Sequence, residues 1–481
     1  MATQTRQIPP HFIVIVPGYM GSKLRDKTTG KVVWVDFSSI PFNPLQWGDW
    51  LDHLLKTMAY PNDNLEPAGI MDQVIFVPPW AKQEHYNRLI EAFQIMGYQA
   101  DPARYPENEL DVYGFGYDWR QDNRISARQL GAAIERWRAY HPGAQVWLIA
   151  HSNGGLVARW YIEKEGGKEH VGRLFLMASP WDGTVKAMRL LFDGLEMLFR
   201  QQFNLFNLPE RSRAMLRTFP SIYQLIPHQD PFLRGLNNEP VDPFNDLGWL
   251  EDEQHRQLLL DAQRFNQELG TTTSVETLCF FGRKRPTTTY GIVRPAAMNR
   301  WSDVTWSDTE AGDGTLSERT AVHPNAQQIL PFVAGHGDIY VDPAVLTFLQ
   351  WELMGKYRKH ERASLLGQHV KINFAAERDA YRPGETIALW ATAHKVKDDS
   401  PITRARIEAQ LLWRQALPGA QQVIPPQNLP QVRLQESIPT PGRYESNLVA
   451  PDVEGYYLLQ ASVKVAGQPT HKFEELIVIE T

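Results

Sequence analysis

Residues 146–165 constrain the fold more than any other segment of this 481-residue chain. Val146–Ala150 is a short apolar run, typical of a strand buried on both faces, and Leu156–Glu165 has the pattern of a helix. The connecting turn, Ala150-His151-Ser152-Asn153-Gly154-Gly155, has small residues two positions before and after its serine. A strand, a tight turn and a helix in this order are typical of a nucleophile elbow, which exposes a serine hydroxyl at the top of a sheet. We therefore predict Ser152 as a nucleophile.

Further apolar runs of strand length accompany this turn. They are Phe12–Val16, Asp111–Tyr117, Leu174–Ala178, Thr277–Phe281 and Ile329–Val333. Segments with helical spacing, such as Gln129–Tyr140, lie between them. Short apolar strands that alternate with helices predict an α/β fold with a parallel sheet covered on both faces. With the elbow, this pattern indicates an α/β-hydrolase sheet.

The pattern changes at about residues 183–270, which we interpret as a helical cap inserted after a sheet strand. Val185–Phe203 has apolar residues at helical spacing with Lys and Arg among them. Such a stripe can dock on lipid, although a helix that faces the core is the commoner explanation. A helical subdomain without contact to substrate is the alternative to a cap.

The last part of the chain has a different pattern, with apolar and polar residues alternating at period two. Seven such runs are Val370–Phe374, Thr386–Ala393, Arg406–Trp413, Val432–Ser437, Arg443–Leu448, Tyr456–Val465 and Phe473–Ile479. Short alternating strands separated by turns predict an all-β, immunoglobulin-like sandwich. We expect a hydrolase domain over 1–357, a polar linker, and the β-sandwich over 368–481.

A hydrolytic serine needs a carboxylate and a histidine, which follow the serine in this order along an α/β-hydrolase chain. Asp313 lies between Gly312 and Gly314, a setting that suits an exposed carboxylate on a tight loop. Asp303 and Asp308 are nearby competitors without this setting. An ordinary Asp-Gly turn is the alternative.

For the base we favour His336, which comes directly after the apolar run Ile329–Val333. His323 is the rival, but it precedes that run and so falls at the wrong end of the strand. The tetrahedral intermediate also needs two backbone donors. We expect them to be the amides of Asn153, after the nucleophile, and of Tyr19, in the glycine-flanked loop after Phe12–Val16.

These segments resemble the lecithin:cholesterol acyltransferase family, which includes lysosomal phospholipase A, over about the first 350 residues. Val16–Leu24 resembles its oxyanion loop, Tyr117–Arg120 its Y-D-W-R signature, Ala150–Gly155 its A-H-S-M-G-G elbow, Ser179–Gly183 its A-P-W-G-G segment, and Gly312–Thr315 with His336 its acid and histidine. The resemblance implies a capped hydrolase that acts on acyl esters of lipids, with Ser152, Asp313 and His336 as triad and Tyr19 and Asn153 as oxyanion amides. It implies that Asp118 and Arg120 fix loop structure.

Three departures from the family accompany this resemblance. Asn153 stands in place of methionine, and Asp182 in place of glycine. The chain has one cysteine, Cys279, so it lacks the disulfide-closed lid of animal members. We therefore interpret it as a prokaryotic-type member with an added β-sandwich, and the departures leave substrate and lid mechanism open.

Composition and charge narrow the function further. The net charge is −6 without long runs of one sign, which argues against a nucleic-acid partner. No apolar run reaches the length of a membrane span, and we see no metal-ligand spacing and no need for a cofactor. We expect a cytoplasmic protein, peripheral contact with a membrane surface being left open, and the β-sandwich is a candidate site for a protein partner.

The sequence thus predicts a serine-dependent lipid acyl hydrolase or O-acyltransferase that acts through an acyl-enzyme on phospholipid or related esters. A carboxylesterase or lipase for small or neutral esters is the first alternative. A catalytically retired binding or scaffold protein is the second.

Overall fold

The structure is a computed structural model of the whole chain. It describes residues 11–34, 47–71, 73–76, 81–84, 86–195, 208–229, 231–295, 300–309, 312–354, 365–366, 370–378, 380–395, 400–416, 424–438, 440–465 and 471–480. The chain divides into two compact units. The first comprises residues 1–90 and 98–340, and the second 91–97 and 341–481. The predicted boundaries at 357 and 368 stay a prediction, because most of the linker lies outside the described residues.

A six-stranded parallel sheet forms the centre of the first unit. Its order is β15 (Gln328–Phe332), β12 (Glu276–Gly282), β9 (Val171–Met177), β8 (Gln145–His151), β1 (His11–Val16) and β7 (Val112–Gly114). Every residue of β1 is buried, as expected of a strand covered on both faces. Parallel strands place all their carboxyl ends at one edge, so the loops that follow β1, β8, β12 and β15 converge there.

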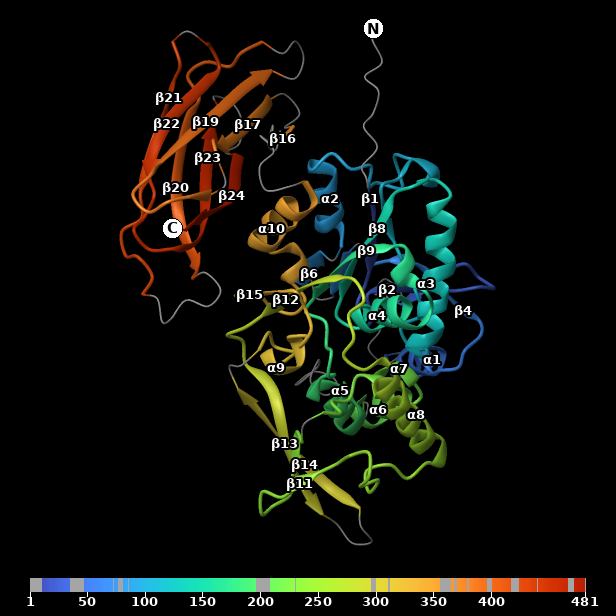
Figure 1. Cartoon of the computed structure of the whole chain (residues 1–481). Coiled ribbons are helices and arrows are strands. Elements are labelled where there is room, and N and C mark those ends of the chain that lie inside the picture. The colour runs from blue at the N-terminus through green and yellow to red at the C-terminus, as the bar shows by residue number, and fades with distance from the viewer. Residues whose placement is uncertain are drawn as a thin grey trace. The chain divides into compact units, whose positions relative to one another are not determined.

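Two helices, each of which follows a strand of this sheet, pack against each other. α3 (Asn123–Arg138) packs against α4 (Gly154–Lys164), which contacts β1, β8 and β9 (Figure 1). Asp122 caps the N-terminus of α3, because its carboxylate accepts a hydrogen bond from the amide of Arg124. Its apolar face, Leu130, Ile134 and Trp137, is buried in the core. The predicted α/β-hydrolase sheet is confirmed.

The insertion after β9 is largely helical. It contains α5 (Val185–Asp193), α6 (Leu208–Leu216), α7 (Pro220–Gln224) and α8 (Glu253–Leu269), with the short strands β10 (Leu233–Arg234) and β11 (Pro240–Val241). α5 is shorter than the predicted helix Val185–Phe203, because the chain turns at Gly194 with a φ of 74°. Residues 196–207 lie outside the described residues.

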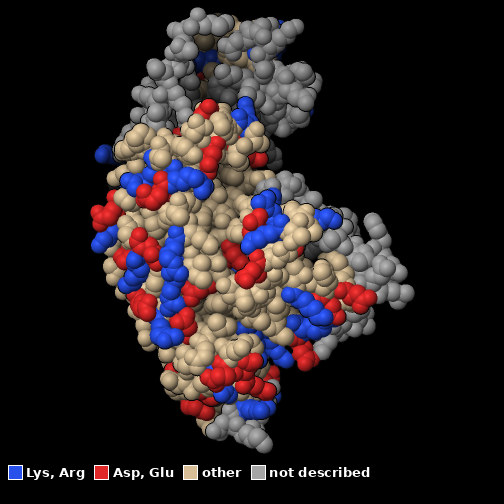
Figure 2. Space-filling view, turned by 90° about the vertical axis from the view of Figure 1, so that its right-hand side faces the viewer, with Lys and Arg blue, Asp and Glu red and all other residues tan. Residues whose placement is uncertain are grey.

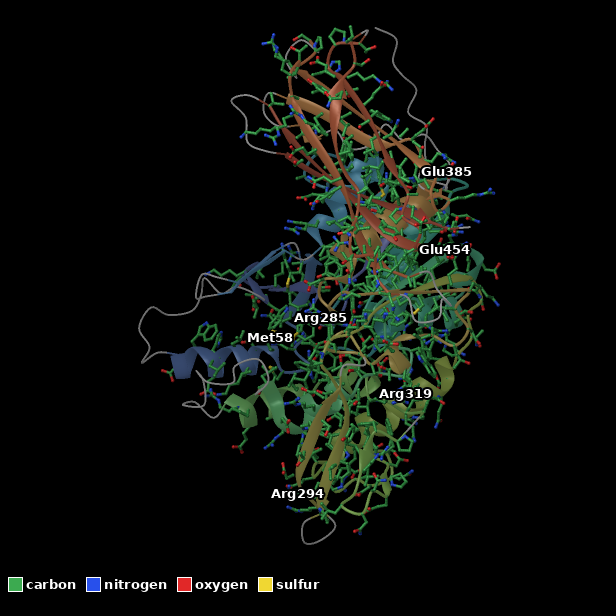
Figure 3. The ribbon with its side chains drawn as sticks, turned by 90° about the vertical axis from the view of Figure 1, so that its left-hand side faces the viewer. Met58, Arg285, Arg294, Arg319, Glu385 and Glu454 are labelled. Carbon is green, nitrogen blue, oxygen red and sulfur yellow. The ribbon has the colours of Figure 1, made fainter. Side chains whose placement is uncertain are left out.

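A long hairpin without a clear signal in the sequence follows β12. β13 (Thr287–Pro295) pairs with β14 (Trp301–Thr309), and β13 also pairs with β10 of the insertion. Figure 3 shows Arg294 near the tip of this hairpin. Polar and apolar residues do not alternate regularly along these two strands, so the sequence carries only a weak period-two signal for them.

Smaller elements complete the two units. The remaining ones are β2 (Ser22–Asp26), β3 (Val32–Trp34), α1 (Trp47–Met58), β4 (Leu65–Ile70), β5 (Gln73–Phe76), β6 (Ala81–Glu84), α2 (Asn87–Ile95), α9 (Glu318–Ala321) and α10 (Pro343–Met354), with single 3-10 turns at Glu107–Glu109, Gly167–Glu169 and Ile339–Val341. β2, β3 and β4 form a three-stranded antiparallel sheet. β2 begins directly after the loop that follows β1, and the Met71 amide, directly after β4, donates to the Gly21 carbonyl of that loop.

The second unit consists of α10, the end of α2 and a run of β-strands. Its strands are β16 (Leu365–Leu366), β17 (Val370–Ala376), β18 (Ala380–Tyr381), β19 (Thr386–Lys395), β20 (Arg406–Gln415), β21 (Gln431–Glu436), β22 (Arg443–Val449), β23 (Gly455–Lys464) and β24 (His471–Ile479). β21 pairs with β20 through residues 431–434 and with β22 through residues 435–436, so that it joins the strands into one sheet with the order β16-β17-β19-β22-β21-β20-β23-β24-β18. The predicted all-β character is confirmed, and its immunoglobulin-like class stays a prediction.

The face of the molecule drawn in Figure 2 has no large field of one charge among the described residues. On the face in Figure 2, Lys and Arg are interspersed with Asp and Glu. Across the described part of the chain, none of the helices combines the length and the apolar character needed to cross a membrane.

Candidate active site

Ser152 sits on a strained turn at the carboxyl end of β8. Its φ is 50°, in the left-handed region that side chains other than glycine rarely adopt. The Ser152 amide donates to the Met177 carbonyl, which ties the turn to β9. The residue two positions on must be glycine, because a Cβ on Gly154 would lie 2.4 Å from the Val16 carbonyl oxygen. The strain and the close packing together hold the Ser152 hydroxyl in one place.

The structure brings the three predicted triad residues together. His336 Nε2 lies 2.9 Å from Ser152 Oγ, and His336 Nδ1 lies 2.9 Å from Asp313 Oδ2. His336 follows β15, Asp313 lies on the loop beyond β14, and both meet the elbow at the carboxyl edge of the sheet. These distances are within hydrogen-bond reach of a nucleophile, a base and an orienting carboxylate.

The environment of Asp313 keeps this carboxylate ionised. Burial raises its pKa, but the charge and hydrogen bond of His336 and the amides of Leu316 and Thr315 outweigh burial, so the pKa lies below its ordinary value. Both amides donate to Asp313 Oδ1, at 2.7 Å and 2.8 Å, which leaves Oδ2 for the imidazole. The acid loop packs on the end of β12, where a Cβ on Gly282 would lie 2.7 Å from Asp313 Cβ.

Helix α5 of the insertion contacts the acid loop. Lys186 Nζ donates to Thr315 Oγ1 at 3.1 Å, and Thr184 Oγ1 donates to the Thr315 carbonyl. Burial lowers the pKa of Lys186, Asp313 raises it and Arg189 lowers it, with a net decrease. The insertion is therefore bonded to the loop that carries the acid, as a cap would be.

The rival residues lie elsewhere. His323 is buried, its Nδ1 accepts from the Asn325 amide, and burial with the Arg159 charge lowers its pKa to about 3. Asp308 on β14 accepts from Thr288 Oγ1. The lone Cys279 is buried, and burial raises the pKa of its thiol to about 11, so it is no reactive thiol.

The loop after β1 lies against the elbow. A Cβ on Gly18 would lie 2.8 Å from Ser152 Cβ, so only glycine allows this approach. Met20 has a φ of 63°, and the Gly21 amide donates back to the Gly18 carbonyl, which closes a tight turn around Tyr19. Among the described residues, the amides of Tyr19 and Asn153 have no acceptor in the protein. Two such amides beside a nucleophile suit an oxyanion hole.

The Tyr117–Arg120 segment forms hydrogen bonds with the loop after β1. Tyr117 Oη donates to the Pro17 carbonyl at 2.9 Å, and Trp119 Nε1 donates to the Ser22 carbonyl at 3.2 Å. Arg120 is fully buried, forms a two-point ion pair with Asp118 and donates to the carbonyl of Met58. Figure 3 shows Met58 at the end of α1. These contacts are structural, in agreement with the loop-fixing role expected of Asp118 and Arg120.

Both residues that depart from the family pattern have partners in the fold. Asn153 and Asn123 exchange side-chain amide hydrogen bonds at 2.9 Å and 3.2 Å, which ties the elbow to the start of α3. Asp182 is fully buried and accepts from the amides of His228 and Gln229, each at 2.9 Å. Asn153 therefore braces the elbow, and Asp182 fixes the chain that follows α7.

Two residues at the site are missing from the sequence predictions. Tyr86 and the side chain of His151 lie next to Gly18 and His336. His151 belongs to the elbow motif, but the motif assigns a role only to its neighbour Ser152. No local pattern marks Tyr86, because its contacts are with residues more than 60 positions away. In the part of the chain that the structure describes, no cluster of His, Cys, Asp or Glu could hold a metal ion.

Comparison with known proteins relates this chain to one family of lipid acyltransferases and phospholipases. Residues 73–275 match the family described as lecithin:cholesterol acyltransferase. Phospholipase A(1) LCAT3 of Arabidopsis thaliana is 25% identical over 45% of this chain and 52% of its own length. Phosphatidylcholine-sterol acyltransferase of Mus musculus is 26% identical over 38% of this chain and 46% of its own. The chain thus spans about half the length of these relatives.

A solved structure extends the comparison to the fold. A chain of the Tle4–Tli4 complex superposes with a TM-score of 0.51 at 15% identity, over 72% of this chain and 99% of that one. At this identity the likeness concerns the fold alone.

Proposed function

On the premise that this chain is a lecithin:cholesterol acyltransferase-like α/β-hydrolase, we propose that it is a serine-dependent lipid acyl hydrolase or O-acyltransferase. One observation carries the proposal. Asp313 Oδ2, His336 Nδ1, His336 Nε2 and Ser152 Oγ form a continuous chain with two contacts of 2.9 Å each. This chain can remove the proton from a serine hydroxyl and hold the positive charge that results.

The geometry supports the following mechanism. His336 Nε2 accepts the proton of Ser152 as Oγ attacks an ester carbonyl, and Asp313 stabilises the imidazolium through Nδ1. The amides of Tyr19 and Asn153 donate to the oxyanion. The imidazolium then protonates the leaving alcohol, and an acyl-serine remains. Water or a second alcohol, deprotonated by His336, attacks this ester and releases Ser152.

The names of the relatives support lipid esters as the substrate class. One is a phospholipase and the other acts between phosphatidylcholine and a sterol, so both cleave an acyl ester of a phospholipid. They differ in the acceptor that receives the acyl group. For this chain we propose phospholipid or a related acyl ester as donor, and the acceptor decides between hydrolysis and transfer.

The test measures fatty acid released from phosphatidylcholine vesicles by the purified protein and by Ser152→Ala. We expect release that falls at least about 10⁴-fold in the variant. Ser274→Ala, which changes an exposed serine bonded to Glu163, is the control and should match the wild type. Added long-chain alcohols then test transfer through the ester that forms.

Other outcomes select other functions. Ser152-dependent cleavage of short water-soluble esters without release from vesicles would assign a carboxylesterase. Absence of both activities, together with failure of a fluorophosphonate to label Ser152, would contradict a serine hydrolase and favour a binding protein.

A further inference from the structure

A buried hydrogen-bond chain connects the three loops of the site. The Gly18 amide donates to Tyr86 Oη at 2.9 Å, Tyr86 Oη lies 2.8 Å from His151 Nδ1, and His151 Nε2 lies 2.9 Å from the carbonyl oxygen of His336. Gly18 belongs to the oxyanion loop, His151 precedes the nucleophile, and His336 is the base. The mechanism above uses neither Tyr86 nor the His151 side chain.

The direction of every bond in this chain is fixed by its two ends. The His336 carbonyl can only accept, so His151 Nε2 carries the hydrogen. A neutral His151 then has an acceptor at Nδ1, which takes the Tyr86 hydroxyl hydrogen. The Tyr86 oxygen then accepts the hydrogen of the Gly18 amide. One arrangement of hydrogens therefore satisfies all three contacts.

The side chains of this chain are also packed tightly. Tyr86 is 1% exposed and stacks on Tyr340 with ring centroids 4.7 Å apart. The Tyr340 ring also meets His151 edge-on at 4.7 Å. A Cβ on Gly18 would lie 2.9 Å from His151 Nδ1. The loop, the ring and the phenol thus leave one another little room to move.

The contact to His336 acts on the base through its own backbone. The His336 amide donates to the Asp313 carbonyl at 3.0 Å, and its carbonyl accepts from His151. Both peptide groups that flank the imidazole are thereby anchored. At the other end, the anchored Gly18 amide sets the turn in which the Tyr19 amide stays unbonded within the described protein.

We propose that Tyr86 and His151 are positioning residues that hold the oxyanion loop and the histidine loop in register with Ser152. This inference rests on the proposed function, because it assigns a role in that same reaction. Both side chains act through the backbone of Gly18 and His336, and the rings of His151 and His336 also lie 5.1 Å apart. Their contribution lies in keeping the oxyanion amide and the imidazole within the sub-ångström tolerance that such a site needs.

The first test is Tyr86→Phe, which keeps the ring stack and removes the hydroxyl. Tyr98→Phe is a matched control, because Tyr98 Oη also forms a buried 2.8 Å contact with a histidine, His11. We expect kcat to fall about 10²-fold in Tyr86→Phe with KM within about twofold. Affinity for an alkyl boronic acid, which mimics the tetrahedral oxyanion, should fall in parallel. Tyr98→Phe should match the wild type in all three.

A second pair of variants covers the case in which Tyr86→Phe does not fold. His151→Gln keeps one acceptor and one donor, whereas His151→Leu keeps neither. We expect Gln to retain at least about tenfold more kcat than Leu at equal thermal stability. A packing role alone would give equal rates.

The outcomes separate this proposal from the proposed function. Ser152-dependent activity with Tyr86→Phe equal to Tyr98→Phe, or with Gln and Leu equal at His151, would overturn the positioning role alone. A wild type that neither cleaves esters nor reacts with a fluorophosphonate at Ser152 would overturn both.

Discussion

The elbow region of the first unit and the β-strands of the second unit are held together by different interactions. Around Ser152, buried polar groups bond one another, and backbone positions such as Ser152 and Met20 have positive φ. In the second unit the buried residues are mainly aliphatic or aromatic side chains from alternating strand positions, such as Ile407 and Leu459. Ion pairs such as Arg406 with Glu408 lie at its surface.

This difference shows where the chain uses its stability. Burial of apolar area orders the second unit, and in its described core no residue other than glycine has a positive φ. Exposed ion pairs add little. The elbow region instead contains strain and buried polar groups, which are costly unless every hydrogen bond is satisfied. Such a region persists only where the surrounding structure over-determines its geometry. Substitutions should therefore change activity in one region and stability in the other.

Asp313→Asn should give the largest effect. The amide nitrogen would face His336 Nδ1 and impose the wrong tautomer, while the oxygen could still accept the Thr315 and Leu316 amides. We expect kcat to fall about 10⁴-fold with little change in stability, measured by ester hydrolysis and thermal unfolding. Asp303→Asn is the control, and an equal loss there would contradict the choice of acid.

Gly154→Ala should follow in size. Its methyl would lie 2.4 Å from the Val16 oxygen and 2.5 Å from the Pro17 oxygen, which pushes the oxyanion loop away from Ser152. We expect kcat to fall about 10²-fold or more. At Gly143 an added Cβ meets no atom within 4 Å, but the φ is 80°, so Gly143→Ala should lose about 1 kcal/mol of stability through backbone strain and no activity. Equal rates for the two variants would show that the elbow tolerates movement.

Leu459→Ala should affect only the β-unit. Leu459 is fully buried in its core, so the free energy of unfolding of this unit should fall by about 2–5 kcal/mol. Urea unfolding would measure this loss of free energy. Val449→Ala, which changes a residue that is 59% exposed, is the control. Activity below the transition should stay at the wild-type level. A drop in kcat at full folding would contradict the separation of the two regions.

His323→Asn should change the pH dependence of stability. Folding lowers the pKa of His323 from 6.5 to about 3, so the unfolded chain binds a proton that the folded chain does not within this window. Stability should therefore fall as pH decreases from about 6.5 to 3, by about 1.4 kcal/mol per pH unit from this residue.

Removal of the imidazole should flatten the curve in the same window. His170→Asn, a change outside the buried core, is the control. An unchanged slope in His323→Asn would mean that other groups dominate acid unfolding, of which His11, with a pKa of about 4, is the next to change.

Much of the fold can be predicted because its signals are local. Val146–Ala150 is apolar enough to be buried on both faces, and all seven predicted strands of the β-unit overlap observed strands. The β13–β14 hairpin escapes prediction because Thr287–Pro295 and Trp301–Thr309 lack regular alternation. The predicted helix Val185–Phe203 extends too far, because its apolar spacing outweighs Gly194 in a reading of pattern alone.

The sequence by itself determined the order of the chemical groups: a serine on a strand–helix turn, an aspartate between glycines, and a histidine after a late strand. Each depends on its immediate neighbours, which is why chain order suffices to select them. Only the tertiary structure decided that Tyr86 meets Gly18 and His151, and that Asn123 pairs with Asn153. These partners come from distant segments, and a hydrogen bond between distant segments leaves no periodic trace in the chain that folding brings together.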